Sequence, residues 1–179
     1  ALGVSANLNI EGEGEQDHAV VTAERDNVMA ALGWARARGD AELEVRIFAA
    51  VENWWVTAGP TREGMRRAIE LIEQAADLAG VRRAELFRVA GNNTMIIESE
   101  ERGLAFYEES LAEYRRAGDA GGIATMLVRI GFSAHRHEEI ERARVLLNEA
   151  RQLLQRVELP RLELQALTLD GLIAYTEGD

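Results

Sequence analysis

The sequence contains no cysteine and no lysine. Without cysteine the chain has no disulfides, no thiolate nucleophile and no cysteine zinc site, which fits a reducing, cytoplasmic setting. Without lysine it has neither a Schiff-base lysine nor a phosphate-loop lysine, since all 20 basic residues are arginine. These two absences exclude several classes of enzyme.

Proline and long apolar runs are also scarce. Only two prolines occur in 179 residues, while Ala, Leu, Glu and Arg dominate, a composition typical of helices. No apolar run approaches the roughly 18 residues of a membrane span. The start "ALGVSANLNIEG" lacks the basic and apolar regions of a secretory signal and an initiating Met. We therefore expect an all-α chain away from membranes, cut from a longer protein.

Positive charge is in the minority. The formal net charge is -11, and such a surface repels a phosphate backbone instead of releasing its counterions. We therefore expect no direct contact between this chain and nucleic acid.

Small residues recur at a fixed interval. Gly91, Gly131 and Gly171 are spaced 40 apart. Four positions before each glycine stands a large apolar residue: Phe87, Leu127 and Leu167. Twelve positions after the first two glycines stands a small residue: Gly103 and Ala143. After these small residues, further residues of the repeat pattern follow at spacings of three, four and seven, which place them on one face of a helix. Each unit is therefore predicted to be a pair of helices that approach closely at small residues.

Stop and start signals set the boundaries of these units. "ARARGDAELE" and "RRAGDAGGIA" place a glycine at a helix end and Asp40 or Asp119 at the next N-cap, and Pro160 stands near another helix start. The prediction is a partly ordered lead-in over 1–16, an N-terminal helix over 17–39 and repeats over 40–179. The repeats comprise helix pairs at about 41–79, 81–117 and 120–157, and one unpaired helix at about 160–177.

The segment "LVRIGFSAHRHEEIERARVLLNEA" resembles a tetratricopeptide (TPR) repeat, with Gly131, Ala143 and Ala150 in register. The leading Trp of the TPR pattern is replaced by Phe or Leu, and the period is 39 to 40 instead of 34. The resemblance covers about 41–179 and implies an antiparallel helix-hairpin solenoid, wound as a right-handed superhelix.

The longer period is similar to the superhelical repeats of MalT-type and LuxR-type transcriptional activators and related signal-transduction ATPases. The resemblance extends over 23–72 through Glu24, Asn27, Ala30, Ala31, Leu32, Trp34, Gly39, Asp40, Trp54, Trp55, Glu63 and Gly64. It implies a sensor or scaffold segment of a larger multidomain protein.

The motif "HRHEE" has the residue types of a metal site. His135 and His137 point about 200° apart on a helix, so they cannot share one metal face. His135 with Glu139 is the remaining metal candidate, but the repeat register places 134–139 at a turn between two helices. We expect a polar turn, and no catalytic, cofactor or metal site.

Two hydrophobic features have open alternatives. Since Trp54 and Trp55 are adjacent on a helix, we expect one to be buried and the other to be partly exposed or covered by the helix of Trp34; a partner contact is the alternative. The unpaired helix at 160–177 is expected to expose an apolar face that leads to homodimers, formed by Leu162, Leu169, Leu172 and Ile173.

The first helix of each pair in a solenoid lines its concave face. Residues just around the repeated glycine are therefore predicted to face a groove, together with equivalents in the first unit: Arg46, Asn53, Arg88, Asn92, Met95, Phe132, His135, Leu172 and Tyr175. Arg88 and Asn92 are suited to a peptide carboxylate. The predicted partners are a protein or peptide, neighbouring domains of the parent protein, or a small-molecule effector; an unoccupied, solvated groove is the alternative.

Overall fold

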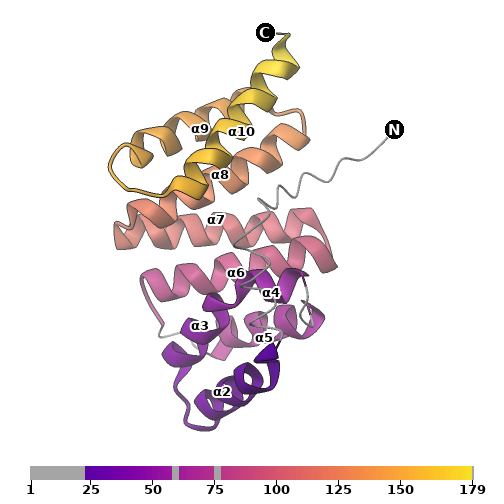
Figure 1. Cartoon of the computed structure of the whole chain (residues 1–179), viewed down its shortest axis with the longest axis vertical. Coiled ribbons are helices and arrows are strands. Elements are labelled where there is room, and N and C mark those ends of the chain that lie inside the picture. Colours follow the sequence, from indigo (N-terminus) through magenta and orange to yellow (C-terminus); the bar gives the residue numbers. More distant parts are fainter. Residues whose placement is uncertain (1–22, 58–60, 75–77, 179) are drawn as a thin grey trace.

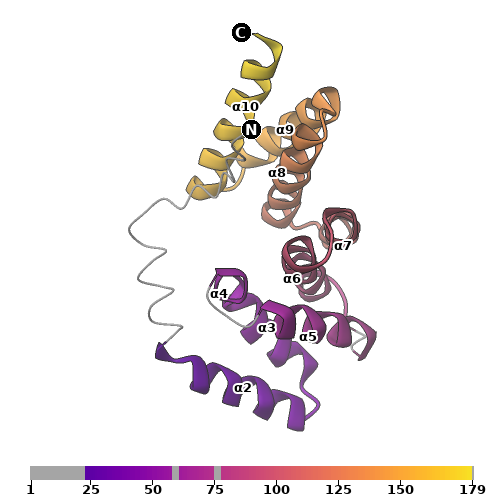
Figure 2. The same ribbon diagram turned by 90° about the vertical axis from the view of Figure 1, so that its right-hand side faces the viewer.

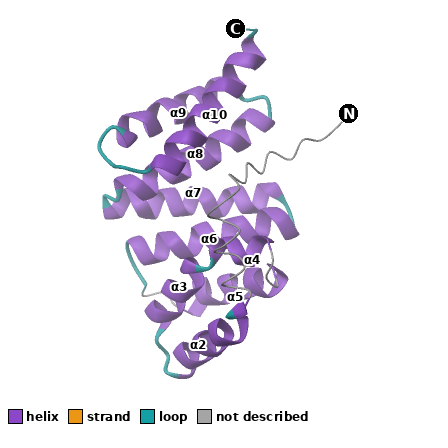
Figure 3. Cartoon of the chain, in the orientation of Figure 1, coloured by secondary structure: helices purple, strands orange, loops and turns teal. Residues whose placement is uncertain are grey.

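The computed structural model describes residues 23–57, 61–74 and 78–178, and every regular element among them is a helix (Figure 3). The lead-in over 1–16 and the expected start of the N-terminal helix at 17 lie outside the described residues. The described helices are α2 (Arg25–Ala37), α3 (Ala41–Ala50), α4 (Glu52–Thr57), α5 (Thr61–Gln74), α6 (Val81–Ile97), α7 (Glu100–Ala117), α8 (Ala120–Arg136), α9 (Ile140–Leu154) and α10 (Pro160–Glu177). The prediction of an all-α chain is thereby confirmed.

Glycine and aspartate end and start successive helices as the sequence indicated. Gly118 follows α7 with φ +70°, and Asp119 accepts a hydrogen bond of 2.9 Å from the backbone N–H of Gly122. Gly39 (φ +67°) and Asp40 form the same stop and start between α2 and α3. The left-handed backbone and the short acidic cap satisfy groups that a helix end leaves unpaired.

The helices are stacked in chain order, with α2 at one end and α10 at the other (Figure 1). Helix α6 packs against α7, and α8 against α9; α7 also contacts α8, and α10 contacts both α8 and α9. The expected pairs at 81–117 and 120–157 correspond to α6 with α7 and α8 with α9. In the expected pair at 41–79, the first helix is divided into α3 and α4.

Two apolar clusters form the core, and α6 contributes to both. Leu86, Val89 and Ala90 of α6 pack in the cluster that contains the aromatic residues of α3 and α4. Ala84 of the same helix packs in the second cluster, which extends to α10. Because α6 is covered on two faces, it fixes the position of the N-terminal helices relative to the C-terminal ones.

Two of the three repeated glycines, Gly91 and Gly131, lie where helices approach closely, whereas a Cβ on Gly171 would meet no atom within 4 Å. A Cβ on Gly91 would lie 2.5 Å from Cδ1 of Tyr107 and 3.0 Å from the carbonyl oxygen of Gly103. A Cβ on Gly131 would lie 2.7 Å from Cδ2 of Leu169. The absence of a side chain therefore allows α7 to cross α6, and α10 to pack on α8.

The expectation that one of the two tryptophans could be partly exposed is wrong, while its alternative, cover by the helix of Trp34, agrees with the presence of α2 residues in the same apolar cluster. Trp54 and Trp55 are both buried, whereas Trp34 is 55% exposed. Phe48 of α3 stacks on Trp55, with 4.8 Å between the ring centroids. The helix is interrupted at Val51, where α3 ends and the short α4 begins. Helices α5 and α6 both contact α4, so both of its tryptophans are covered.

The expected exposed face of the 160–177 helix is also wrong. Leu162, Leu169 and Ile173 are buried in the second cluster, and Leu172 is half-buried. Both α8 and α9 lie on one side of α10 (Figure 2), and they cover this face. The large apolar residues that α10 does expose are Leu164, Leu167 and Tyr175.

Candidate functional site

A polar cluster, which we call the Glu52 network, joins four helices in the middle of the stack. It consists of Glu52 (α4), Arg88 and Asn92 (α6), Tyr107 (α7) and Arg129 (α8). Arg88 forms an ion pair with Glu52, and the amide of Asn92 donates to the same carboxylate. The amide oxygen of Asn92 accepts from both Tyr107 and Arg129. The Glu52 network thus links α4, α6, α7 and α8 through side-chain contacts.

The Glu52 network carries more positive than negative charge. Arg88 and Arg129 face one carboxylate, since Arg129 Nη1 also lies 3.8 Å from Glu52 Oε1. Burial and then the nearby Arg129 guanidinium lower the pKa of Arg88. Removing a guanidinium from water and placing it beside another cation both disfavour its charged form. The Glu52 carboxylate offsets this cost.

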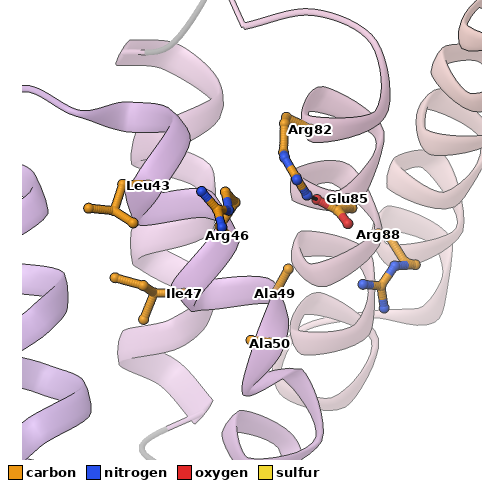
Figure 4. A pocket seen from close by; sticks show the side chains of 8 residues that line it. All are labelled: Leu43, Arg46, Ile47, Ala49, Ala50, Arg82, Glu85 and Arg88. Atoms are coloured by element: carbon orange, nitrogen blue, oxygen red, sulfur yellow. Dashed lines mark hydrogen bonds and ion pairs between the residues drawn. The ribbon is translucent and has the colours of Figure 1, made fainter.

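An open cleft of about 450 Å³ lies beside Arg88, between α3 and α6 (Figure 4). Its lining is Leu43, Arg46, Ile47, Ala49, Ala50, Arg82, Glu85 and Arg88. Arg82 Nη1 lies 2.6 Å from Glu85 Oε2, so this cation has a partner. Arg46 is exposed and has no ion pair among the described residues. The cleft therefore combines an apolar wall with one available guanidinium.

The structure brings only some of the predicted groove residues together. Arg46 and Arg88 line the same cleft, and Asn92 lies behind them in the Glu52 network. The Asn53 side chain lies outside the described part of the structure. The side chain expected to receive a ligand carboxylate, Arg88, already binds the carboxylate of Glu52.

The remaining predicted groove residues contact other helices or solvent. Met95 lies against Gly103, and Phe132 packs against the second apolar cluster. His135 Nε2 is 3.2 Å from the carbonyl oxygen of Leu172 and 3.0 Å from Oγ1 of Thr176, so it bridges α8 and α10. Tyr175 is 83% exposed. These residues do not form one continuous site.

The "HRHEE" motif ends α8 and forms the turn before α9. Ser133 donates a 2.8 Å hydrogen bond to Glu100 of α7, Arg136 pairs with the same carboxylate, and His137 Nε2 lies 3.5 Å from it. Burial by itself would raise the pKa of Glu100, but the hydrogen bonds from Arg136 and Ser133 and the charges of Arg136 and His137 lower it.

In the described residues, no three His, Asp or Glu side chains gather in a way that could hold a metal ion.

Searches of protein-family models and of curated proteins each found no match to this chain. The TPR and MalT-type resemblances therefore remain expectations from the residues themselves. None of the described helices has the length and apolar character needed to cross a bilayer.

Sequence reasoning missed Glu52, Tyr107 and Arg129. One signal was present, because Glu52 precedes Asn92 by 40 residues, the interval of the repeated glycines. Extending that interval back one unit identifies Glu52, whereas Asn53 was chosen as the equivalent position. Nothing in the sequence indicated that Tyr107 and Arg129 would meet at Asn92.

Proposed function

We propose that this chain is a non-catalytic binding scaffold that holds an acidic protein segment in the cleft between α3 and α6. Its architecture in this proposal is a TPR-like helix-hairpin solenoid, and its setting is a larger transcriptional regulator or signalling ATPase. The observation that carries the binding proposal is Arg46, which is exposed at the cleft and lacks an ion-pair partner among the described residues.

The cleft offers two kinds of contact to such a segment. Leu43 and Ile47 give α3 an apolar surface, and Arg46 of the same helix gives a guanidinium. Guanidinium groups bind carboxylates through two parallel hydrogen bonds. A segment with alternating apolar and acidic side chains therefore matches the lining better than a basic one.

The overall charge narrows the class of ligand. A net charge of -11 repels a long polyanion. A short acidic segment needs only the local field of the cleft, where Arg82 and Arg88 are paired with Glu85 and Glu52 and Arg46 adds a positive charge that is unpaired among the described residues. A small organic carboxylate would use the same guanidinium, so it is the competing ligand within this proposal.

Fluorescence anisotropy with labelled peptides tests the cleft. We expect a peptide of alternating Glu and Leu to bind, the matching Lys and Leu peptide not to bind, and salt to weaken binding. Arg46→Glu should weaken binding by about tenfold, which corresponds to about 1.4 kcal/mol. The matched control is Arg156→Glu, which makes the same charge change at an exposed residue outside the cleft.

Equal binding of both peptides, or equal effects of the two arginine variants, would exclude the cleft as the binding site. Binding of a free dicarboxylate but not of the acidic peptide would favour a small-molecule effector. The wider role has a separate test, the reading frame on both sides of this sequence. A parent protein without any nucleotide-binding, DNA-binding or cyclase module would contradict the regulator setting.

A further inference from the structure

Helix α10 has two apolar faces, and only one of them is covered. Leu162, Ala166, Leu169 and Ile173 are buried against α8 and α9. On the opposite face, Leu164 is 44% exposed, Leu167 61% and Tyr175 83%. These are three of the six large exposed hydrophobic residues among the described residues. Such a concentration on one helix face is typical of an interaction surface.

The open face has the pattern that other helices use to receive a partner. Gly171 follows Leu167 by four residues, as Gly91 follows Phe87 and Gly131 follows Leu127. At Gly91 the ring of Tyr107 from α7 fills the space that a Cβ would occupy. At Gly171 nothing lies within 4 Å of the same position. Gly171 is thus an empty notch of the kind that Tyr107 fills on α6.

Helix α10 also has the residue pattern of α7, the helix whose Tyr107 packs on Gly91. In α7 the small residue Gly103 is followed by Tyr107 four positions later and by Ser110 three positions after that. In α10 the equivalent series is Gly171, Tyr175 and Gly178. Helix α9 has the same spacing in Ala143, Leu147 and Ala150, which are all buried.

We propose that the open face of α10 binds the α10 of a second copy of this chain, antiparallel and related by a twofold axis near Gly171. Tyr175 of each copy then fills the Gly171 notch of the other, as Tyr107 fills the notch at Gly91. This pairing is isologous, so one surface satisfies both partners. It uses a surface separate from the cleft of the proposed function.

The side-chain pairs that this twofold arrangement forms between the two copies of α10 are compatible in size and charge. Leu167 of one copy faces Tyr175 of the other, as Phe87 of α6 lies near Phe106 of α7, with 6.3 Å between the ring centroids. Around the crossing the helix face carries no charged side chain: Leu164, Leu167, Thr168, Gly171, Ala174, Tyr175 and Gly178. No like charges are therefore brought together at the centre. A single helix pair is a small interface, so we expect a weak, concentration-dependent dimer.

Sedimentation equilibrium over about 1 µM to 1 mM, a range suited to weak interfaces, should show the mass rising from 19.8 kDa towards twice that value. Tyr175→Ala removes the side chain that fills the notch, and Gly171→Leu fills the notch itself. Both residues are exposed, so circular dichroism and urea unfolding of the monomer should keep the helical signal. Each variant should raise the dimer dissociation constant at least about tenfold. Val145→Ala, at a 64% exposed residue of α9, is the matched control and should leave it unchanged.

Crosslinking tests the position of the axis. The chain has no cysteine, so Gly171→Cys introduces a unique thiol next to its symmetry mate. Mild oxidation or a short bismaleimide should give a covalent dimer, and adding Tyr175→Ala should reduce its yield. Val145→Cys should give none above the collisional background.

A chain that stays monomeric up to about 1 mM would overturn the proposal. A dimer that tolerates both Tyr175→Ala and Gly171→Leu, or that crosslinks equally at Val145→Cys, would overturn it too.

Discussion

Arg67 of α5 binds Glu44 of α3 through two parallel hydrogen bonds, Nε to Oε1 and Nη2 to Oε2, each 2.5 Å long. Both side chains are almost fully buried, with 7% and 3% of their surfaces exposed. Burial alone would lower the pKa of Arg67, but the hydrogen bonds to Glu44 and Glu70 raise it. This ion pair fixes the packing of α5 on the N-terminal helices.

Breaking the pair from one side should destabilise the protein more than removing it altogether. Glu44→Leu leaves Arg67 with Glu70 at 3.1 Å as its remaining charged partner, and Arg67→Leu leaves Glu44 with Arg36 at 3.6 Å. We expect each variant to lower the free energy of unfolding by up to about 3–5 kcal/mol. The double variant should lose less than the sum of the two. Urea unfolding followed by circular dichroism measures all three. Arg66→Leu is the control, since its 61% exposed side chain pairs with Glu70 at the surface, and it should change stability by less than about 1 kcal/mol.

The two glycines Gly91 and Gly171 should respond to alanine in opposite directions. Gly91→Ala places a Cβ 2.5 Å from the Tyr107 ring and 3.0 Å from a backbone oxygen. The helices must move apart, and we expect a loss of about 1–3 kcal/mol. Gly171→Ala meets open space within α10, and alanine is the better helix former, so we expect a gain of about 0.5–1 kcal/mol. Urea unfolding at low micromolar concentration, where the proposed dimer is dissociated, compares them; equal destabilisation would contradict the packing at Gly91.

The pair between Glu100 and Arg136 should make stability depend on pH. The folded-state pKa of Glu100 lies below its ordinary value of 4.5. Its stabilising contribution is therefore complete above that ordinary value and is lost as the pH falls through the folded-state pKa. Glu100→Gln should cost about 1 kcal/mol at pH 7. The difference from the natural chain should shrink below pH 4.5; a constant difference from pH 7 to pH 3 would argue against a charged partner, and Glu101→Gln, at an exposed neighbour, is the control.

Glu138 occupies a backbone position that other turns of this chain give to glycine. Its φ is +61°, while Gly39 and Gly118 have φ of +67° and +70°. Glu138→Gly removes the steric cost of the left-handed conformation, and we expect a gain of about 0.5–1 kcal/mol. Glu139→Gly, at φ -82°, should instead destabilise. Thermal unfolding of the two variants compares the two positions directly.

The local sequence determined where most described helices begin and end. Gly118 followed by Asp119 ends one helix and caps the next because these two residues satisfy backbone groups within a few positions of themselves. The 40-residue interval of glycines likewise located the close approach at Gly91. The first signal depends only on neighbouring residues and the second on residue type at a fixed interval, so the sequence carries both directly.

Only the tertiary structure decided which neighbour covers each face. Periodicity shows that Leu162, Leu169 and Ile173 share a face of α10, but it does not show that α8 and α9 bury that face and leave Leu167 exposed. It also gives no indication that Val51 would break a helix so that Trp54 and Trp55 are both buried. The partners of Glu52 come from α6 and α8, at separations of 36 to 77 residues. Such contacts depend on how the whole chain packs, because the free energy of burial comes from helices that meet only in the folded state.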